Sequence, residues 1–368
     1  MESSDTLVSD KSTAVSRRTL LCGLLLPWVS SVAGRGEAAP TPSEIAVPPA
    51  AEQALSRIAF GSCHKLDRPF TVWDSILAQK PQFFIFLGDT VYLDTVDMEA
   101  KKAMYDKLAA VPNFARFREA VPIVATWDDH DYGANDGGAD YPKRDESQKI
   151  FLDFFHEPQD SIRRKRAGVY NSYVFGPEGK RTQVILLDTR YFRTPLKHDE
   201  QLGGYLPQRD AAATMLGEAQ WKWLAEQLRA PAELRLIVSS IQVEHEEQPN
   251  EKWLNMPAER AKLFKTVVDS KASGAIFISG DRHHGEISGM DIGAGYKVYD
   301  ITSSGLNCPY EAYDEPNRHR VGDILWTENF GMIQVDWNAK DPGIDLEVRT
   351  GKGNLGVRKQ IKLSELRP

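Results

Sequence analysis

The chain has 368 residues, of which 41% are hydrophobic and 26% are charged. This composition is ordinary for a globular protein and excludes collagen, extensive disorder and a multispanning membrane protein. The net charge of −7 argues against nucleic-acid binding through a general basic field. Three cysteines are too few for a disulfide scaffold.

The N-terminus has the pattern of an export signal. Arg17 and Arg18 stand directly before an apolar stretch over residues 20–33, which is too short to span a bilayer and ends in small residues. We predict a twin-arginine-like export signal over residues 1–33. An ordinary secretory signal or a retained anchor are the alternatives. The expected location is therefore the periplasm, the cell surface or the extracellular space, and the export machinery is an expected partner.

The remainder divides into a Pro/Ala-rich linker over residues 34–55 and a single catalytic domain over residues 56–368. Apolar runs alternate there with amphipathic segments, which indicates a layered α/β core, in one domain or two. In chain order we expect a strand at 57–63, a helix at 70–79, a strand at 82–89, a helix at 98–108, a strand at 122–127, a helix at 147–155, paired strands at 168–175 and 182–188, a helix at 217–229, a strand at 234–240, a helix at 258–269, a strand at 275–279, and tail strands at 297–302, 331–337, 344–349 and 357–363.

Three of these strands end in acidic residues and histidines. In open α/β sheets, ligands gather beyond the carboxyl ends of the strands, so these side chains are expected to converge. Carboxylates a few ångströms apart repel each other unless they are protonated or a cation neutralises them. We therefore predict a metal site, in which one Asp can bridge two metals. The residues after the three strands are Asp89 and Tyr92, then Asp128, Asp129, His130 and Asp131, then Asp281, His283 and His284.

Single members of this set have simpler explanations. A Gly-Asp pair after a strand is usually a turn, and Asp128 or Asp131 alone can cap a helix. Cys63 ends the first strand just as Asp89 ends the second. It is either a metal ligand, a small buried hydrophobe, or half of a disulfide with Cys308. A thiolate and a phenolate beside oxygen ligands suit ferric iron better than magnesium.

Five motifs occur in a particular order along the chain: Gly61-Ser62-Cys63; Gly88-Asp89 followed by Tyr92; Trp127-Asp128-Asp129-His130-Asp131; Leu187-Asp188-Thr189-Arg190; and Gly280-Asp281-Arg282-His283. Together they resemble the alkaline phosphatase D-like (PhoD-like) family of the metallophosphoesterase superfamily, over roughly residues 57–335. The resemblance implies an α/β, four-layer metallophosphoesterase-like fold, with a central β-sandwich of two mixed sheets flanked by α-helices. It also implies a site with Fe³⁺ and Ca²⁺.

The resemblance implies a role for each matching residue. Iron is held by Cys63, Tyr92 and His283, Asp89 bridges the two metals, and calcium is held by Asp129 and Asp281. His130 stands where the superfamily places a catalytic histidine that faces the leaving group. Arg190 is a candidate contact for phosphate, with a salt bridge to a nearby acid as an equal alternative. Asn135 is a further candidate in the substrate site.

The implied activity is hydrolysis of phosphate esters by a metal-activated water, with small-molecule phosphate esters as substrates and no stable nucleic-acid or membrane partner. One alternative keeps the site and changes the substrate, giving a phosphodiesterase or a phospholipase-D-type enzyme. An exposed aromatic rim around the site would favour that version. Alternatives from other classes are a non-catalytic calcium-dependent phosphate-binding protein and a calcium-stabilised structural domain.

Overall fold

The computed structural model describes residue 46 and residues 48–201 and 203–368. These residues belong to one compact unit, Ser43–Pro368. The predicted export signal over residues 1–33 and the first part of the linker lie outside the described residues. In the described part of the chain, no helix is both long enough and apolar enough to cross a bilayer.

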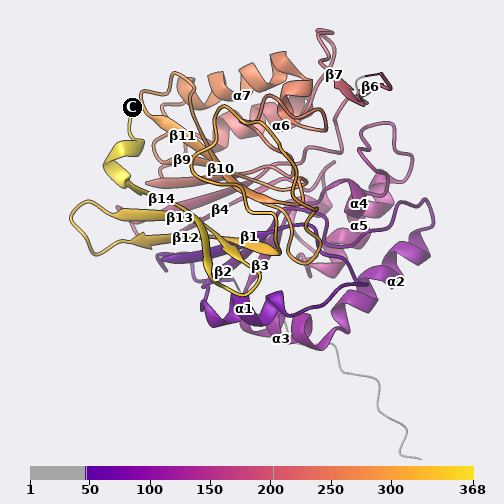
Figure 1. Cartoon of the computed structure of the whole chain (residues 1–368), viewed down its shortest axis with the longest axis horizontal. Coiled ribbons are helices and arrows are strands. Elements are labelled where there is room, and N and C mark those ends of the chain that lie inside the picture. The colour runs from indigo at the N-terminus through magenta and orange to yellow at the C-terminus, as the bar shows by residue number, and fades with distance from the viewer. Residues whose placement is uncertain (1–45, 47, 202) are drawn as a thin grey trace, which may run out of the picture. The chain divides into compact units, whose positions relative to one another are not determined.

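Two six-stranded mixed sheets form the centre of the fold (Figure 1). The first has the order β14-β13-β12-β1-β2-β3 and the second the order β10-β11-β9-β8-β5-β4. The first sheet consists of β1 (Arg57–Gly61), β2 (Phe83–Phe86), β3 (Ile123–Ala125), β12 (Asn329–Asp336), β13 (Gly343–Thr350) and β14 (Leu355–Lys362). The second consists of β4 (Asn171–Phe175), β5 (Thr182–Leu186), β8 (Leu234–Val238), β9 (Ala275–Ser279), β10 (Gly285–Asp291) and β11 (Lys297–Ser303).

Helices cover the outer face of each sheet. In Figure 1, α6 (Gly217–Gln227) and α7 (Pro257–Asp269) lie over the second sheet, and α1 (Val72–Ala78), α2 (Met98–Ala109) and α3 (Pro112–Ala120) lie on the side of the first. The short α4 (Asp129–Tyr132) and α5 (Arg144–Phe154) follow β3, and β6 (Lys197–Asp199) pairs with β7 (Gly204–Leu206) in a small hairpin. The predicted four-layer fold with two mixed sheets is confirmed.

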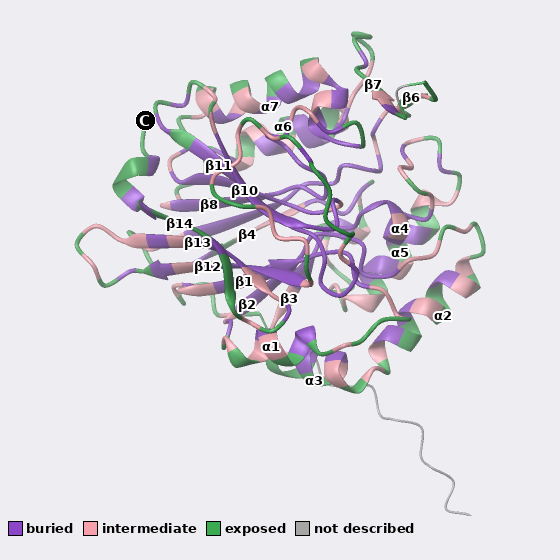
Figure 2. Cartoon of the chain, viewed as in Figure 1, coloured by how far each residue is buried: buried purple, intermediate pink, exposed green. Residues whose placement is uncertain are grey.

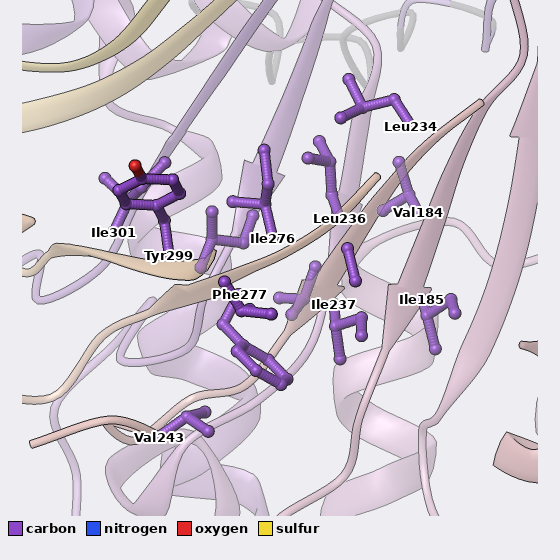
Figure 3. Packing of buried hydrophobic residues seen from close by; sticks show 14 of the residues in the cluster. Val184, Ile185, Leu234, Leu236, Ile237, Val243, Ile276, Phe277, Tyr299 and Ile301 are labelled. Atoms are coloured by element: carbon purple, nitrogen blue, oxygen red, sulfur yellow. The ribbon is translucent and has the colours of Figure 1, made fainter. Parts of the chain in front are cut away.

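The continuous apolar runs are explained by strands that are buried on both faces. In β1, Ile58 and Phe60 belong to the hydrophobic cluster that contains residues of both sheets and of α6 and α7. Ala59, which lies between them in the strand, belongs to the cluster that contains residues of α1 and α3. Successive strand side chains point to opposite faces, so a strand between two layers needs apolar residues at every position. Figure 2 shows the central strands buried and the outer helix faces exposed. Figure 3 shows the second sheet's packing around Leu236 and Phe277.

Most of the expected elements form within a few residues of their predicted ends, including the β4–β5 hairpin. Helix α3, which has Pro112 in its first turn, was not predicted from the sequence. Strand β10 was not predicted either, because Gly285 and Gly289 interrupt the apolar pattern that marks a strand. Asp281 and His283 lie in the short connection between β9 and β10, so these two strands fix both ends of that connection.

Candidate metal centre

The carboxyl ends of the parallel strands from the two sheets meet at one place. Ser62, directly after β1, forms a parallel bridge with Ser304, directly after β11. Beyond this junction lie the side chains that the sequence analysis singled out. Cys63 follows β1, Asp89 and Tyr92 follow β2, Asp129 and His130 open α4 after β3, and Asp281 and His283 lie between β9 and β10.

Four of the predicted metal ligands have left-handed backbone conformations. The φ angles are 61° at Cys63, 52° at Asp89, 70° at Asp281 and 54° at His283. Such conformations cost about 1–3 kcal/mol each for residues other than glycine, and they persist only where the surroundings enforce them. The described chain has eight non-glycine residues with positive φ, and four of them are predicted metal ligands. This concentration is typical of a functional site.

One group of ligand atoms joins both sheets. The sulfur of Cys63, a carboxylate oxygen of Asp89 and a ring nitrogen of His283 lie within 4.8 Å of one another, and all three residues are buried. Cys63 Sγ is 3.5 Å from Asp89 Oδ2. The hydroxyl of Tyr92 donates to the same Oδ2 at 2.9 Å and lies 3.1 Å from His283 Nε2. The four residues predicted to surround iron thus form one connected cluster.

A second group shares Asp89 with the first. Ligand atoms of Asp89, Asp129 and His130 lie within 4.8 Å of one another. Backbone amides hold the Asp129 carboxylate, because its Oδ1 accepts from His130 N at 2.8 Å and its Oδ2 from Asp136 N at 2.8 Å. Asp281 is not in either group, although its carboxyl interacts electrostatically with that of Asp129. The common member is Asp89, the residue that the resemblance assigns as the bridge.

The electrostatics of these groups fit a cation. Asp89 Oδ1 is buried without a hydrogen-bond partner in the described part of the chain. Burial and the charge of Asp129 raise the pKa of Asp89 well above its usual range, and burial and the charge of Asp128 do the same for Asp281. Burial also raises the pKa of the Cys63 thiol. Without a cation these acids would be held protonated, whereas a cation among them stabilises the ionised forms.

Comparison with known proteins identifies the family. The sequence model described as PhoD-like phosphatase matches residues 58–307. This chain belongs to the PhoD-like phosphatase family. The family makes it a phosphoric ester hydrolase, and membership of this family together with the two groups of ligand atoms implies bound metal ions. No curated protein matched the chain.

Solved structures share the fold of this PhoD-like phosphatase. The structure of PhoD has a TM-score of 0.67 and 16% identity, covering 88% of this chain and 73% of its own. A purple acid phosphatase, PPD1, from yellow lupin (Lupinus luteus) seeds has a TM-score of 0.59 and 12% identity, covering 86% of this chain and 55% of its own. GAP50, described as the anchor in the inner membrane complex of Plasmodium, has a TM-score of 0.55 and 12% identity, covering 84% and 89%.

The side chain of His130 lies at the edge of the PhoD-like centre. Its Nδ1 is 2.9 Å from Asp94 Oδ1, and its ring packs against that of Tyr92 with centroids 4.2 Å apart. Burial lowers the pKa of His130, but the hydrogen bond to Asp94 and the charge of Asp129 outweigh it and raise the pKa to about 9. A protonated imidazole at this place can donate a proton at neutral pH. Asp94 was missed because no motif marks an exposed Asp two residues after Tyr92.

Arg190 is committed to an ion-pair network. Its side chain is fully buried, Nε donates to Asp128 Oδ1 at 2.6 Å, and Nη1 donates to Glu251 Oε1 at 2.9 Å. Arg193 pairs with the same Glu251. The salt-bridge alternative for Arg190 is therefore present in the structure, whereas its contact with phosphate stays a prediction. Glu251 lies far away in the sequence and carries no motif that would have revealed it.

Two predictions remain, the role of Asn135 in the substrate site and the possible disulfide between Cys63 and Cys308. Asn135 is exposed, and its Nδ2 donates to Asp136 Oδ2 at 2.8 Å. Its backbone neighbour Asp136 contacts Asp129, so Asn135 lies close to the centre without touching a ligand atom in this structure. Cys63 and Cys308 are both free thiols, and Cys308 Sγ donates to the Cys63 carbonyl at 2.9 Å. The alternative of a disulfide between them is wrong here.

Proposed function

We propose that this PhoD-like phosphatase hydrolyses phosphate esters at a centre that holds Fe³⁺ and Ca²⁺. The observation that carries the proposal is the position of Asp89 in both groups of ligand atoms. On one side of Asp89 are a thiol, a phenol and an imidazole, a donor set that suits ferric iron. On its other side are the carboxylate of Asp129, which suits calcium, and the imidazole of His130. The proposed iron ligands are Cys63, Asp89, Tyr92 and His283, and the proposed calcium ligands are Asp89, Asp129 and Asp281.

The bound cations would supply Lewis acidity and a water of lowered pKa. The chain's own residues supply orientation and a proton. His130, whose pKa is raised by the hydrogen bond to Asp94, is placed to give its proton to the leaving alkoxide oxygen. Asp128 is the N-cap residue of α4, and Arg190 Nε donates a hydrogen bond to its carboxylate. The turn that carries Asp129 and His130 is therefore fixed before substrate binds.

We further propose that the protein acts after export through the signal over residues 1–33, as the single catalytic domain over residues 56–368. The support for export is Arg17-Arg18 before an apolar stretch. Cell fractionation of the wild type and of a variant with both arginines replaced by lysine tests it. Export through the twin-arginine route predicts loss of the exported fraction in the variant, and an unchanged distribution contradicts that route.

One observation favours a phosphodiesterase as a second candidate. Tyr310 is 49% exposed and its ring stacks on that of His283, with centroids 4.2 Å apart and planes 11° from parallel. An exposed aromatic ring beside a proposed iron ligand can contact an apolar or planar group on the far side of a phosphodiester. Tyr310→Ala is therefore expected to weaken turnover of a diester more than that of a monoester.

The proposal is tested by following hydrolysis of a chromogenic phosphomonoester and its diester side by side, with and without a calcium chelator. Chelator-sensitive turnover of the monoester supports the phosphatase. Faster turnover of the diester promotes the second candidate. Absence of turnover of both substrates by folded, metal-loaded protein would contradict the proposal and favour a binding protein.

A further inference from the structure

A second group of imidazoles and carboxylates lies apart from the proposed iron–calcium ligands. His245 follows β8, His284 directly precedes β10, Glu286 lies in β10, and Glu315 lies in the segment between β11 and β12. All four side chains are at most 2% exposed. Ligand atoms of His245, Glu286 and Glu315 lie within 4.8 Å of one another. Burying such polar groups is costly unless each has a partner.

The facing atoms of these four residues do not satisfy one another. His245 Nε2 is 3.5 Å from Glu315 Oε1 and 4.0 Å from Glu286 Oε1. His284 Nε2 is 3.4 Å from Glu286 Oε1 and 3.9 Å from Glu315 Oε1. All four separations exceed the usual N–H···O hydrogen-bond length. Within the described chain, both Nε2 atoms and Glu315 Oε1 have no hydrogen-bond partner at all. Glu286 Oε1, the fourth facing atom, accepts from Gln242 Nε2 at 2.8 Å. Three of the four facing atoms are therefore buried without a partner in the described chain.

The outward-facing atoms, in contrast, are held firmly. Arg320 Nε donates to Glu286 Oε2 at 2.7 Å, and Arg282 Nη2 donates to Glu315 Oε2 at 2.7 Å. His284 Nδ1 is 3.0 Å from the Arg282 carbonyl oxygen, which can only accept, so Nδ1 carries the proton and the Nε2 lone pair faces inward. Metal-binding histidines are oriented in this way, by donating the other ring N–H to a carbonyl or carboxylate.

We propose that His245, His284, Glu286 and Glu315 bind one zinc ion. Tetrahedral zinc with nitrogen and oxygen ligands at about 2.0–2.1 Å keeps those ligands about 3.4 Å apart, and the four nitrogen–oxygen separations of 3.4–4.0 Å are close to this distance. His284 is not in the group of three whose ligand atoms all lie within 4.8 Å of one another, so zinc binding would also have to bring the two imidazoles together. Two imidazole ligands favour zinc over calcium or magnesium, which prefer oxygen. His245 Nδ1 accepts from the Gln248 backbone N–H at 3.4 Å, so zinc binding at His245 Nε2 requires that this long hydrogen bond be given up and that the ring proton move to Nδ1.

The charges of the cluster do not favour an anion. The carboxylates of Glu286 and Glu315 each pair with one guanidinium group, that of Arg320 and that of Arg282. With neutral imidazoles these two pairs have no net charge, whereas the inward-facing lone pair of His284 Nε2 suits a cation.

The proposed zinc ion has a structural role. His284 is the neighbour of His283, and Glu315 belongs to the segment that carries Tyr310 on its way to β12. A metal that ties β8, β10 and this segment together would hold the His283 turn in its left-handed conformation. Because the ion would bind only the folded chain, it would also stabilise the fold.

The test uses the full chain in an Asp89→Asn background, which weakens the proposed iron–calcium centre and so isolates the second site. Zinc content is measured by elemental analysis after incubation with ZnCl₂ and dialysis. His284→Gln in this background removes a proposed zinc ligand, and His198→Gln, at an exposed histidine in β6, is the matched control. Thermal unfolding with and without ZnCl₂ is recorded for each variant, so that a variant that fails to fold is recognised.

We expect about one zinc ion per chain in the Asp89→Asn protein and in its His198→Gln control, and loss of most of that zinc with His284→Gln. Added ZnCl₂ should raise the unfolding temperature of the first two proteins and leave that of the third unchanged. Equal zinc content with and without His284 would overturn the proposal. So would an Asp89→Asn protein that is folded and retains no zinc, since the cluster would then be filled by water or by ion pairs alone.

Discussion

Replacing Arg190 by methionine should destabilise the fold strongly. The guanidinium group is fully buried and hydrogen-bonded to both Asp128 and Glu251. Its removal leaves two carboxylates in the interior, with Glu251 still paired to Arg193. Breaking a buried ion pair by deleting one partner costs about 3–5 kcal/mol in free energy of unfolding. Arg116 pairs with Asp74 at the surface, where both side chains are about half exposed, and supplies the control.

The assay is urea unfolding of wild type, Arg190→Met and Arg116→Met, with the slope m compared to confirm that the same surface is exposed. The expected loss is about 3–5 kcal/mol for Arg190→Met and about 0.2–1 kcal/mol for Arg116→Met. Adding Glu251→Gln to Arg190→Met should cost less than Glu251→Gln costs in the wild type, because Glu251 has then already lost one of its two arginine partners. If Arg190→Met loses less than about 1 kcal/mol and instead raises KM for a phosphomonoester, the reasoning is refuted and Arg190 is a substrate contact.

Three further predictions test individual features. Gly88→Ala should lower the free energy of unfolding by about 1–3 kcal/mol, because Gly88 has φ +106° and a Cβ there would lie 2.4 Å from Asp128 Cβ. The control Gly179→Ala, which places its Cβ in open space, should lower it less. Equal losses in the two variants would contradict this. Burial lowers the pKa of His64 to about 3, so below pH 6.5 the unfolded state binds more protons than the folded state. Between pH 7 and pH 4.5 the free energy of unfolding should therefore fall by about 2–3 kcal/mol more in the wild type than in His64→Gln, as measured by chemical unfolding. Parallel pH profiles for the two proteins would contradict this. Cys63→Ser should reduce iron retention on dialysis by at least about tenfold, and unchanged iron content would remove Cys63 from the ligand set.

The sequence predicts the layered core well because its physical signal is local. Strands such as Phe83–Phe86 are buried on both faces, so every position is apolar and the run stands out. The residues at the strand ends were found for the same reason, since Cys63, Asp89 and Asp129 each follow such a run. That these ends meet depends on parallel pairing, which the alternation of strands and helices already indicates.

The partners of those residues could not be predicted in the same way. Glu251 reaches Arg190 across 61 residues of sequence, and Asp94 reaches His130 across 36, with no motif at either acid. The proposed zinc ligands were still harder to predict from the sequence. His245, Glu286 and Glu315 come from three separate segments, and only the folded topology brings them together. Left-handed backbone at Asp281 and His283 also has no sequence signal, since glycine would be the expected residue there.

The central claim is that Asp89 joins two metals in one centre. Its most direct test is the iron and calcium content of the purified wild type and of Asp89→Asn, with Asp106→Asn, at an exposed helix position, as the matched control. The claim predicts about one iron and at least about one calcium ion per chain in the wild type and the control, and loss of both metals together with phosphatase activity in Asp89→Asn. Retention of both metals at wild-type levels by Asp89→Asn would contradict it.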